Sequence, residues 1–197
     1  MAEDVSDKRA AIVKSALILF TQRGFHGTPT SMISRGAGVS AGTLFLYFPT
    51  KNDLINSVFF GAKERMGLAA REGYEAQKGI RNRVKHIWGN IIRWGVGHPE
   101  EFMFIEQFHS SPYISDITQE QAFKNFEFLF DVFNDGVRRG ELKTMDRRLA
   151  IDMLYHANAA VIRLIIQQEA VKDIDELIDR SFDIVWGGIS VKGQSKT

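Results

Sequence analysis

Residues 28–53 of the chain read TPTSMISRGAGVSAGTLFLYFPTKND. This stretch predicts two short helices joined by a tight turn, followed by the start of a third helix. Thr28 can cap the first helix, and Pro29 suits its first position, where a missing N–H leaves no hydrogen bond unmade. Ser40 can cap the second helix, which we expect to span residues 41–47. A short glycine-containing turn between two helices is typical of the helix-turn-helix motif.

Glycine and proline define the ends of these helices. Gly38 can take a positive φ in the turn, and Ala37 is small enough to allow close packing of the two helices. Pro49 disfavours helical geometry at the preceding residue, so the second helix should end there. Thr50 and Asp53, three residues apart, form a pair like a capping box and predict the start of the next helix.

Residues 38–54, GVSAGTLFLYFPTKNDL, resemble the signature of the tetracycline-repressor (TetR) family of transcriptional regulators. The family's usual run is Gly-Val-Ser, a variable position, Gly-Thr-Leu-Tyr, a variable position, Tyr-Phe, two variable positions and Lys. The detailed resemblance covers roughly residues 8–60, and beyond it only helical periodicity and length are similar. The resemblance implies a homodimeric repressor that leaves a pseudo-palindromic operator in double-stranded DNA when a small apolar or amphipathic effector binds.

The composition is that of a globular protein. The chain has 197 residues, of which 44% are hydrophobic and 25% charged, and it has no cysteine. The lack of cysteine excludes disulfides, thiol catalysis and cysteine-ligated metal sites. No apolar run approaches the length of a membrane span and no signal peptide is evident, so we expect a cytoplasmic protein that does not contact the membrane. Residues 1–51 carry six basic and three acidic side chains, a surplus compatible with phosphate contacts.

Helical periodicity continues to the end of the chain and no strand-like alternation occurs. The predicted fold is all-α, with a three-helix DNA-binding head and a larger helical body for ligand binding and dimerisation, about nine helices in total. One of these should run through Phe123, Phe130 and Val137 to Gly140. We expect the DNA-binding domain at residues 1–50, the body at 51–190 and a disordered tail at 191–197.

The second helix of the motif should enter the major groove of DNA. Its predicted reading positions are Ala41, Gly42, Thr43, Phe45, Leu46 and Tyr47, whereas Leu44 and Phe48 should face the core. By resemblance, the candidate phosphate contacts are Thr30, Ser31, Ser40, Tyr47 and Lys51. Ala41, Phe45 and Leu46 depart from the family's basic, tyrosine and polar or aromatic preferences. The resulting apolar face predicts contact with thymine methyl groups. The alternative is that this helix only packs against another domain.

Dimerisation and effector binding are predicted mainly from the resemblance. The predicted dimer interface lies on the last two helices and comprises Ala157, Ala160, Val161, Leu164, Phe182, Val185 and Ile189. These helices could instead cover only the core of their own chain. The predicted effector pocket comprises Phe59, Met66, Trp88, Trp94, Phe102, Met103, Phe108, Tyr113, Phe126, Phe130, His156 and Asn158. Most of these aromatic side chains could equally be ordinary core.

Two other classes of function remain open. Glu106 and His109 match the Glu-x-x-His pattern of di-iron bundles, but only one copy is present, and a single metal would need further ligands such as His98 or Asp116. The chain could also act mainly through protein partners. We expect no enzymatic activity and no cofactor, because the sequence has no glycine-rich phosphate loop after a strand and no recognisable nucleophile arrangement.

Overall fold

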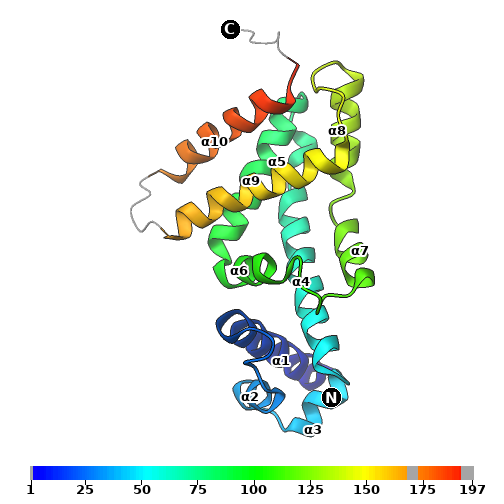
Figure 1. The fold of residues 1–197 in the computed structure, drawn as a ribbon, viewed down its shortest axis with the longest axis vertical. Helices are drawn as coiled ribbons and strands as arrows, with labels where there is room; N and C mark the ends of the chain where they lie inside the picture. Colours follow the sequence, from blue (N-terminus) through cyan, green and yellow to red (C-terminus); the bar gives the residue numbers. More distant parts are fainter. Residues whose placement is uncertain (1, 168–172, 192–197) are drawn as a thin grey trace. The chain divides into compact units, whose positions relative to one another are not determined.

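The computed structural model describes residues 2–167 and 173–191, and these residues form an all-α fold (Figure 1). The helices are α1 (Ala2–Arg23), α2 (Thr30–Gly36), α3 (Ala41–Tyr47), α4 (Lys51–Arg71), the 3₁₀ helix η1 (Tyr74–Ala76), α5 (Ile80–Gly97), α6 (Pro99–Phe108), α7 (Asp116–Lys124), α8 (Phe128–Arg138), α9 (Arg147–Gln167) and α10 (Ile174–Ile189). The all-α prediction is therefore confirmed. The predicted disordered tail falls on residues 192–197, outside the described residues.

One predicted helix is divided in two. The sequence predicts a continuous helix through Phe123 to Gly140, whereas α7 ends at Lys124 and α8 begins at Phe128. Between them the backbone packs against α4, where a Cβ on Gly67 would lie 2.7 Å from the Cβ of Asn125. This contact between distant segments is absent from any local pattern, so periodicity could not reveal the break.

The described residues form two compact units. The first unit comprises residues 2–64 and 99–123, and therefore contains α1–α3, the first part of α4, α6 and most of α7. The second unit comprises residues 65–98, 124–167 and 173–191. The sequence placed α6 in the body, whereas its contacts place it in the same compact unit as the helix-turn-helix.

Aromatic side chains join α6 to α1 in the core of the first unit. The ring of Phe20 is fully buried, and its centroid lies 6.4 Å from that of Phe104 and 6.3 Å from that of Phe108. Burying aromatic rings of this size accounts for much of the stability of a small core. The three-helix head is therefore built on a fourth helix, α6, that comes from far along the chain.

Helix α5 is the centre of the second unit and packs against α8, α9 and α10. Its buried face is apolar, and Gly95 lets α9 approach so closely that a Cβ there would lie 2.7 Å from Ile162 Cδ1. Three exposed ion pairs fix the antiparallel register of α5 and α10: Arg81–Asp183 at 2.6 Å, Lys85–Asp179 at 2.9 Å and Arg93–Asp175 at 2.7 Å. Exposed pairs contribute little stability, about 0–1 kcal/mol each.

Candidate functional site

The turn after α1 fixes the start of the helix-turn-helix. Gly24 has φ +68° and donates its N–H to the Phe20 carbonyl at 2.8 Å, which ends α1 with a left-handed residue. Thr28 is fully buried, and its hydroxyl donates to the carbonyls of Gly24 at 2.8 Å and Leu19 at 3.1 Å. The prediction that Thr28 caps α2 is wrong, because its hydroxyl ties the turn to α1. Pro29 occupies the N-cap position instead.

Close contact between α1 and α2 orients the motif. The Ser15 hydroxyl donates to the Ile33 carbonyl at 3.0 Å, and a Cβ on Gly36 would collide with Ser15 Oγ. Gly38 has φ +67° in the turn, as the sequence predicts. The close approach of α2 to α1 is therefore made possible by Gly36, a contact that the sequence did not predict.

Helix α3 presents an apolar surface to solvent. Leu44 is fully buried and Phe48 is 4% exposed, so both face the core as predicted. On the outer side, Leu46 is 80% exposed and Phe45 is 44% exposed. An exposed leucine of this size is unfavourable in water unless a partner covers it. Leu46 therefore projects from a short helix whose opposite side is buried in the core.

Polar groups surround the start of α3. Ser40 is the N-cap, and its Oγ accepts the N–H of Thr43 at 3.1 Å and lies 2.9 Å from the Thr43 hydroxyl oxygen. Ala41 and Gly42 are exposed beside them, and Tyr47 is half-buried. Among the other candidate phosphate contacts, Ser31 is exposed and Thr30 half-buried at the first turn of α2. The helix start therefore combines exposed backbone N–H groups with hydroxyls, an arrangement suited to phosphate.

Lys51 opens α4 and has partners within the first unit. Its Nζ donates to the Phe25 carbonyl and lies 4.2 Å from the centroid of the Phe25 ring. Burial lowers the pKa of the Lys51 amine below its usual value. Beside it, Thr50 and Asp53 form the predicted capping box: the Thr50 N–H donates to Asp53 Oδ2 at 2.9 Å, and the Asp53 N–H donates to Thr50 Oγ1 at 3.0 Å. The sequence did not predict the contact between Lys51 and Phe25, because Phe25 lies in the turn after α1 and 26 positions separate the two residues.

The predicted effector-pocket residues are divided between the two units. Phe59, Phe102, Met103, Phe108 and Tyr113 belong to the first unit, and Met66, Trp88, Trp94, Phe126, Phe130, His156 and Asn158 belong to the second. Met103 is 50% exposed, and the His156 side chain is 61% exposed. Neither side chain lies in an interior, because each projects from the outer face of its helix. Tyr113 packs on the turn after α1.

Asn158 is a polar side chain in an apolar environment. It lies on α9, is 4% exposed, and its Oδ1 has no hydrogen-bond partner. Its buried neighbours on the same helix include Ala159 and Ile162. A buried carbonyl oxygen without a donor costs about 1–3 kcal/mol, so its retention needs an explanation. A ligand or a buried water that donates a hydrogen bond would supply one.

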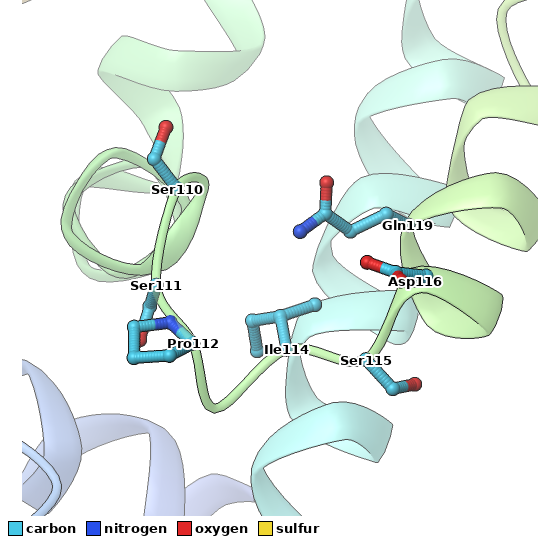
Figure 2. Close-up of a pocket in the computed structure, with 7 residues that line it drawn as sticks. All are labelled: Ser110, Ser111, Pro112, Ile114, Ser115, Asp116 and Gln119. Carbon is cyan, nitrogen blue, oxygen red and sulfur yellow. The ribbon is translucent and has the colours of Figure 1, made fainter.

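A surface hollow of about 550 Å³ lies in the first unit, between the end of α6 and α7 (Figure 2). It is lined by Ser110, Ser111, Pro112, Ile114, Ser115, Asp116 and Gln119. None of these residues was predicted as part of the effector pocket, and only Asp116 was considered before, as a possible metal ligand. In the sequence this region appears only as a loop containing serine and proline, whereas the predicted pocket consists mainly of aromatic side chains.

Helices α9 and α10 expose apolar side chains. On α9, Met153 is 63% exposed and Leu164 is 40% exposed, and on α10 Ile184 is 78% exposed. Among the predicted interface residues, Ala160 is also exposed, and Ala157, Val161, Val185 and Ile189 are half-buried. Phe182 is fully buried, with its ring centroid 6.5 Å from that of Trp88, so its assignment to an interface is wrong. It forms part of the core of its own chain.

The composition of α9 corrects the expectation that no apolar run approaches the length of a membrane span. By length and composition alone this helix could cross a membrane, with a mean hydropathy of 1.5 over its most apolar window. A third of that window is buried within the protein. Helix α9 packs on α5 with one face, so its apolar composition serves a core on one side and leaves Met153 exposed on the other.

Glu106 and His109 are not joined by a third possible metal ligand within the described residues. Glu106 lies in α6 and His109 directly follows this helix, and both residues take part in other interactions. Across the residues that the structure describes, three or more His, Asp or Glu side chains do not gather in a group that could hold a metal ion.

Comparisons with known proteins agree with this geometry. A family profile described as "Bacterial regulatory proteins, tetR family" matches residues 12–58, and one described as "Tetracyclin repressor-like, C-terminal domain" matches residues 59–191. The Fatty acid metabolism regulator protein of Bacillus subtilis (strain 168) is 23% identical over 198 residues, covering 94% of this chain and 97% of that protein. The first profile covers the helix-turn-helix, and the second covers most of the remaining chain.

Solved structures share the fold. A protein described as a tetR family transcription regulator from Shewanella sp. PV-4 has a TM-score of 0.87 and 27% identity, covering 94% of this chain and 99% of that one. The transcriptional regulator FadR from Bacillus subtilis, solved in complex with stearoyl-CoA, has a TM-score of 0.76 and 20% identity, covering 91% and 98%. At that identity the second likeness concerns the fold alone.

Proposed function

Because the chain belongs to the TetR family of bacterial transcriptional regulators, we propose that it is a homodimeric, cytoplasmic repressor that releases its operator when a small molecule binds. The observation that carries this proposal is helix α3, which anchors Leu44 and Phe48 in the core and exposes Phe45 and Leu46. We retain residues 1–50 as the DNA-binding part and residues 51–190 as the part for effector binding and dimerisation.

The proposed DNA interface has two kinds of contact. Phosphate contacts would set the orientation of the head, and we assign them to Thr30, Ser31, Ser40, Tyr47 and Lys51. Such contacts carry no sequence information by themselves. The exposed residues of α3 would read base edges. Because Leu46 and Phe45 are apolar, we expect them to contact thymine C5-methyl groups, the apolar feature of the major groove.

The proposed dimer follows from the size of the DNA-binding head. One seven-residue recognition helix makes few base contacts, and dimers commonly read two half-sites about 34 Å apart. The exposed apolar side chains of α9 and α10, with Ala160 allowing close helix approach, give each chain a surface that could pair with its own copy.

The proposed effector is apolar or amphipathic and carries a hydrogen-bond donor. A curated relative is named for fatty acid metabolism, and a structural neighbour was solved with stearoyl-CoA. In this chain, Trp88 and Trp94 contribute buried aromatic surface to the second unit, and the Asn158 Oδ1 lacks a donor. An effector changes operator affinity only if it binds one conformation of the dimer more tightly than the other.

Selection of DNA sequences by the purified protein tests the proposal. We expect an inverted repeat, with affinity that falls steeply as salt concentration rises. Leu46→Ala should relax base preference at one position in each half-site, by about 0.8 kcal/mol of discrimination, the value of burying one methyl-sized group. Leu68→Ala is the matched control, because Leu68 is 66% exposed on α4 but lies outside the helix-turn-helix. Selection of no sequence, or unchanged preference in Leu46→Ala, would contradict the assigned reading face.

A further inference from the structure

The loop between α6 and α7 is fastened to the DNA-binding head through Tyr113. The Tyr113 ring stacks on the Phe25 ring with centroids 4.0 Å apart and planes 13° apart. The Tyr113 hydroxyl forms a hydrogen bond with His26 Nε2, and the two rings meet edge-on at 5.4 Å. All three residues lie in the first unit. Parallel stacking of two aromatic rings stabilises their contact beyond the burial of their area.

The side chain of Asn56 holds the same loop from α4. Its Nδ2 donates to the Tyr113 carbonyl at 2.8 Å, and its Oδ1 accepts the Ser115 N–H at 2.9 Å. One amide therefore satisfies a donor and an acceptor of the loop backbone. These bonds hold Tyr113 in place against the turn after α1, on both its backbone and its side chain.

Phe25 connects Tyr113 to Lys51. The Phe25 ring stacks on the Tyr113 ring. The Phe25 carbonyl accepts a hydrogen bond from the Lys51 ammonium, and the Phe25 ring lies under the same ammonium. Phe25 also stacks on Phe20, with centroids 5.9 Å apart. The position of the Lys51 ammonium therefore depends on the position of Phe25, which Tyr113 covers.

An ammonium has three N–H donors, and the Phe25 carbonyl takes one of them. The remaining donors can meet a DNA phosphate without breaking that bond. A lysine side chain that is already fixed loses less conformational freedom when it binds, so its phosphate contact is stronger than that of a mobile lysine.

We infer that Tyr113 is a positioning residue for DNA binding: it holds Phe25, and Phe25 holds the Lys51 ammonium ready for a phosphate. This inference rests on the proposed phosphate contact of Lys51. It gives the loop between α6 and α7 direct influence over operator affinity. The same loop forms one wall of the surface hollow, where Pro112 and Ile114 flank Tyr113 in the chain (Figure 2). A change in that loop therefore alters the phosphate contact.

A double-mutant cycle on operator affinity tests the inference. Lys51→Gln should lower the magnitude of the salt slope by about 0.9 for each half-site, because one phosphate contact is lost. Tyr113→Ala should weaken binding by about two- to tenfold per half-site, the effect of releasing one fixed side chain. In the Lys51→Gln background, Tyr113→Ala should have no further effect. Tyr113→Phe keeps the stacked ring and should bind as the unmodified protein does.

The possible outcomes distinguish the role of Tyr113 from the proposed phosphate contact of Lys51. An unchanged affinity and salt slope in Lys51→Gln would remove the phosphate contact and the inference together. The inference alone would be overturned if Lys51→Gln lowers operator affinity and the salt slope as expected, but Tyr113→Ala weakens operator binding equally with Lys51 and with Gln at that position. A Tyr113→Phe loss as large as that of Tyr113→Ala would also overturn it, because the ring stack would then be irrelevant.

Two controls guard against a general loss of structure. Ile117→Ala changes a side chain that is 68% exposed on α7 in the same unit, and it should leave affinity and slope unchanged. Phe25→Leu removes the stack while keeping the backbone carbonyl, and should weaken binding as Tyr113→Ala does. If Tyr113→Ala lowers the melting temperature below the assay temperature, Tyr113→Leu, which removes the stacked ring but keeps an apolar side chain, takes its place in the cycle with the same criterion of additivity.

Discussion

At the scale of single residues, Asn158 shows a conflict between burial and hydrogen bonding. Its side chain is almost completely buried on α9, yet the Oδ1 has no donor. A protein under selection only for stability would place an apolar side chain of similar volume there. Retaining the amide therefore fits a role in binding, at a cost in the stability of the ligand-free protein.

Asn158→Leu should raise the stability of the ligand-free protein. The substitution removes an unbonded carbonyl oxygen while roughly keeping the side-chain volume, and such a group costs about 1–3 kcal/mol. For a chain of this length that corresponds to a rise of about 2–10 °C in the melting temperature, measured by calorimetry. The same variant should bind the effector less tightly.

The control for this prediction is His156→Leu. His156 lies on the same helix with its side chain 61% exposed, so the melting temperature should change little. A lower melting temperature in Asn158→Leu would mean that Oδ1 is bonded within the fold, for example to a buried water, and would contradict the binding role.

Residue roles were predictable from sequence where they depended on near neighbours. Leu44 and Phe48 were placed correctly in the core because their spacing on a short helix fixes which side they face. Phe182 was not, because an apolar position on an amphipathic helix can face either its own core or a partner. The Lys51 contact with Phe25 also escaped prediction, since nothing in the local sequence joins residues 26 positions apart.

At the scale of helices, the contact between α1 and α2 sets the geometry of the DNA-binding motif. The two helices approach so closely at Gly36 that no side chain fits between it and Ser15. The Ser15 hydroxyl also donates to an α2 carbonyl, so the contact is both packed and hydrogen-bonded. Any widening here would change how α3 is presented.

Gly36→Ala should destabilise the first unit. The added methyl group would collide with the Ser15 hydroxyl, and crowding of this kind costs about 1–3 kcal/mol. Chemical denaturation followed by circular dichroism measures the loss in the free energy of unfolding.

The matched control is Gly42→Ala in α3, where the nearest atom to a new Cβ is Ser40 Oγ at 3.8 Å. Gly42→Ala should be neutral or stabilising, because alanine favours the helix by up to about 1 kcal/mol. Equal effects at the two glycines would contradict the packing argument.

Helix ends were predicted where residues close in sequence fix them. The left-handed Gly38 and the Thr50–Asp53 capping box both appear as the local pattern indicated. The break between α7 and α8 was missed, because it depends on packing against Gly67. The membership of α6 in the first unit was missed for the same reason, since Phe104 and Phe108 meet Phe20 across a long stretch of chain.

At the scale of the whole molecule, the exposed apolar faces of α9 and α10 favour assembly. Met153 and Ile184 are each more than 60% exposed, and Leu164 adds to the same pair of helices. Large apolar side chains gathered on neighbouring helices usually mark a protein interface. The sequence predicts an interface on these two helices but could not show which of their residues stay exposed, because only packing within the chain decides which side is left uncovered.

Met153→Asp combined with Ile184→Asp should convert the proposed dimer to a monomer. Burying two unpaired carboxylates at an interface is strongly unfavourable. Sedimentation equilibrium should then give a single chain mass, and affinity for the inverted repeat should fall to that of one half-site. Leu68→Asp is the control, because Leu68 is 66% exposed on α4 in the same unit but lies outside α9 and α10. A double variant that stays dimeric would place the interface elsewhere.

The exposed Leu46 on α3 has a consequence for chemically modified DNA. A reader that relies on apolar contact detects a methyl group on the pyrimidine ring and not the base that carries it. 5-Methylcytosine places its methyl group at the same edge of the major groove as thymine does. A genome that methylates cytosine would therefore offer this protein half-sites that an unmethylated genome of identical sequence does not. The set of regulated promoters would then depend on the methyltransferases of the cell as well as on its DNA sequence.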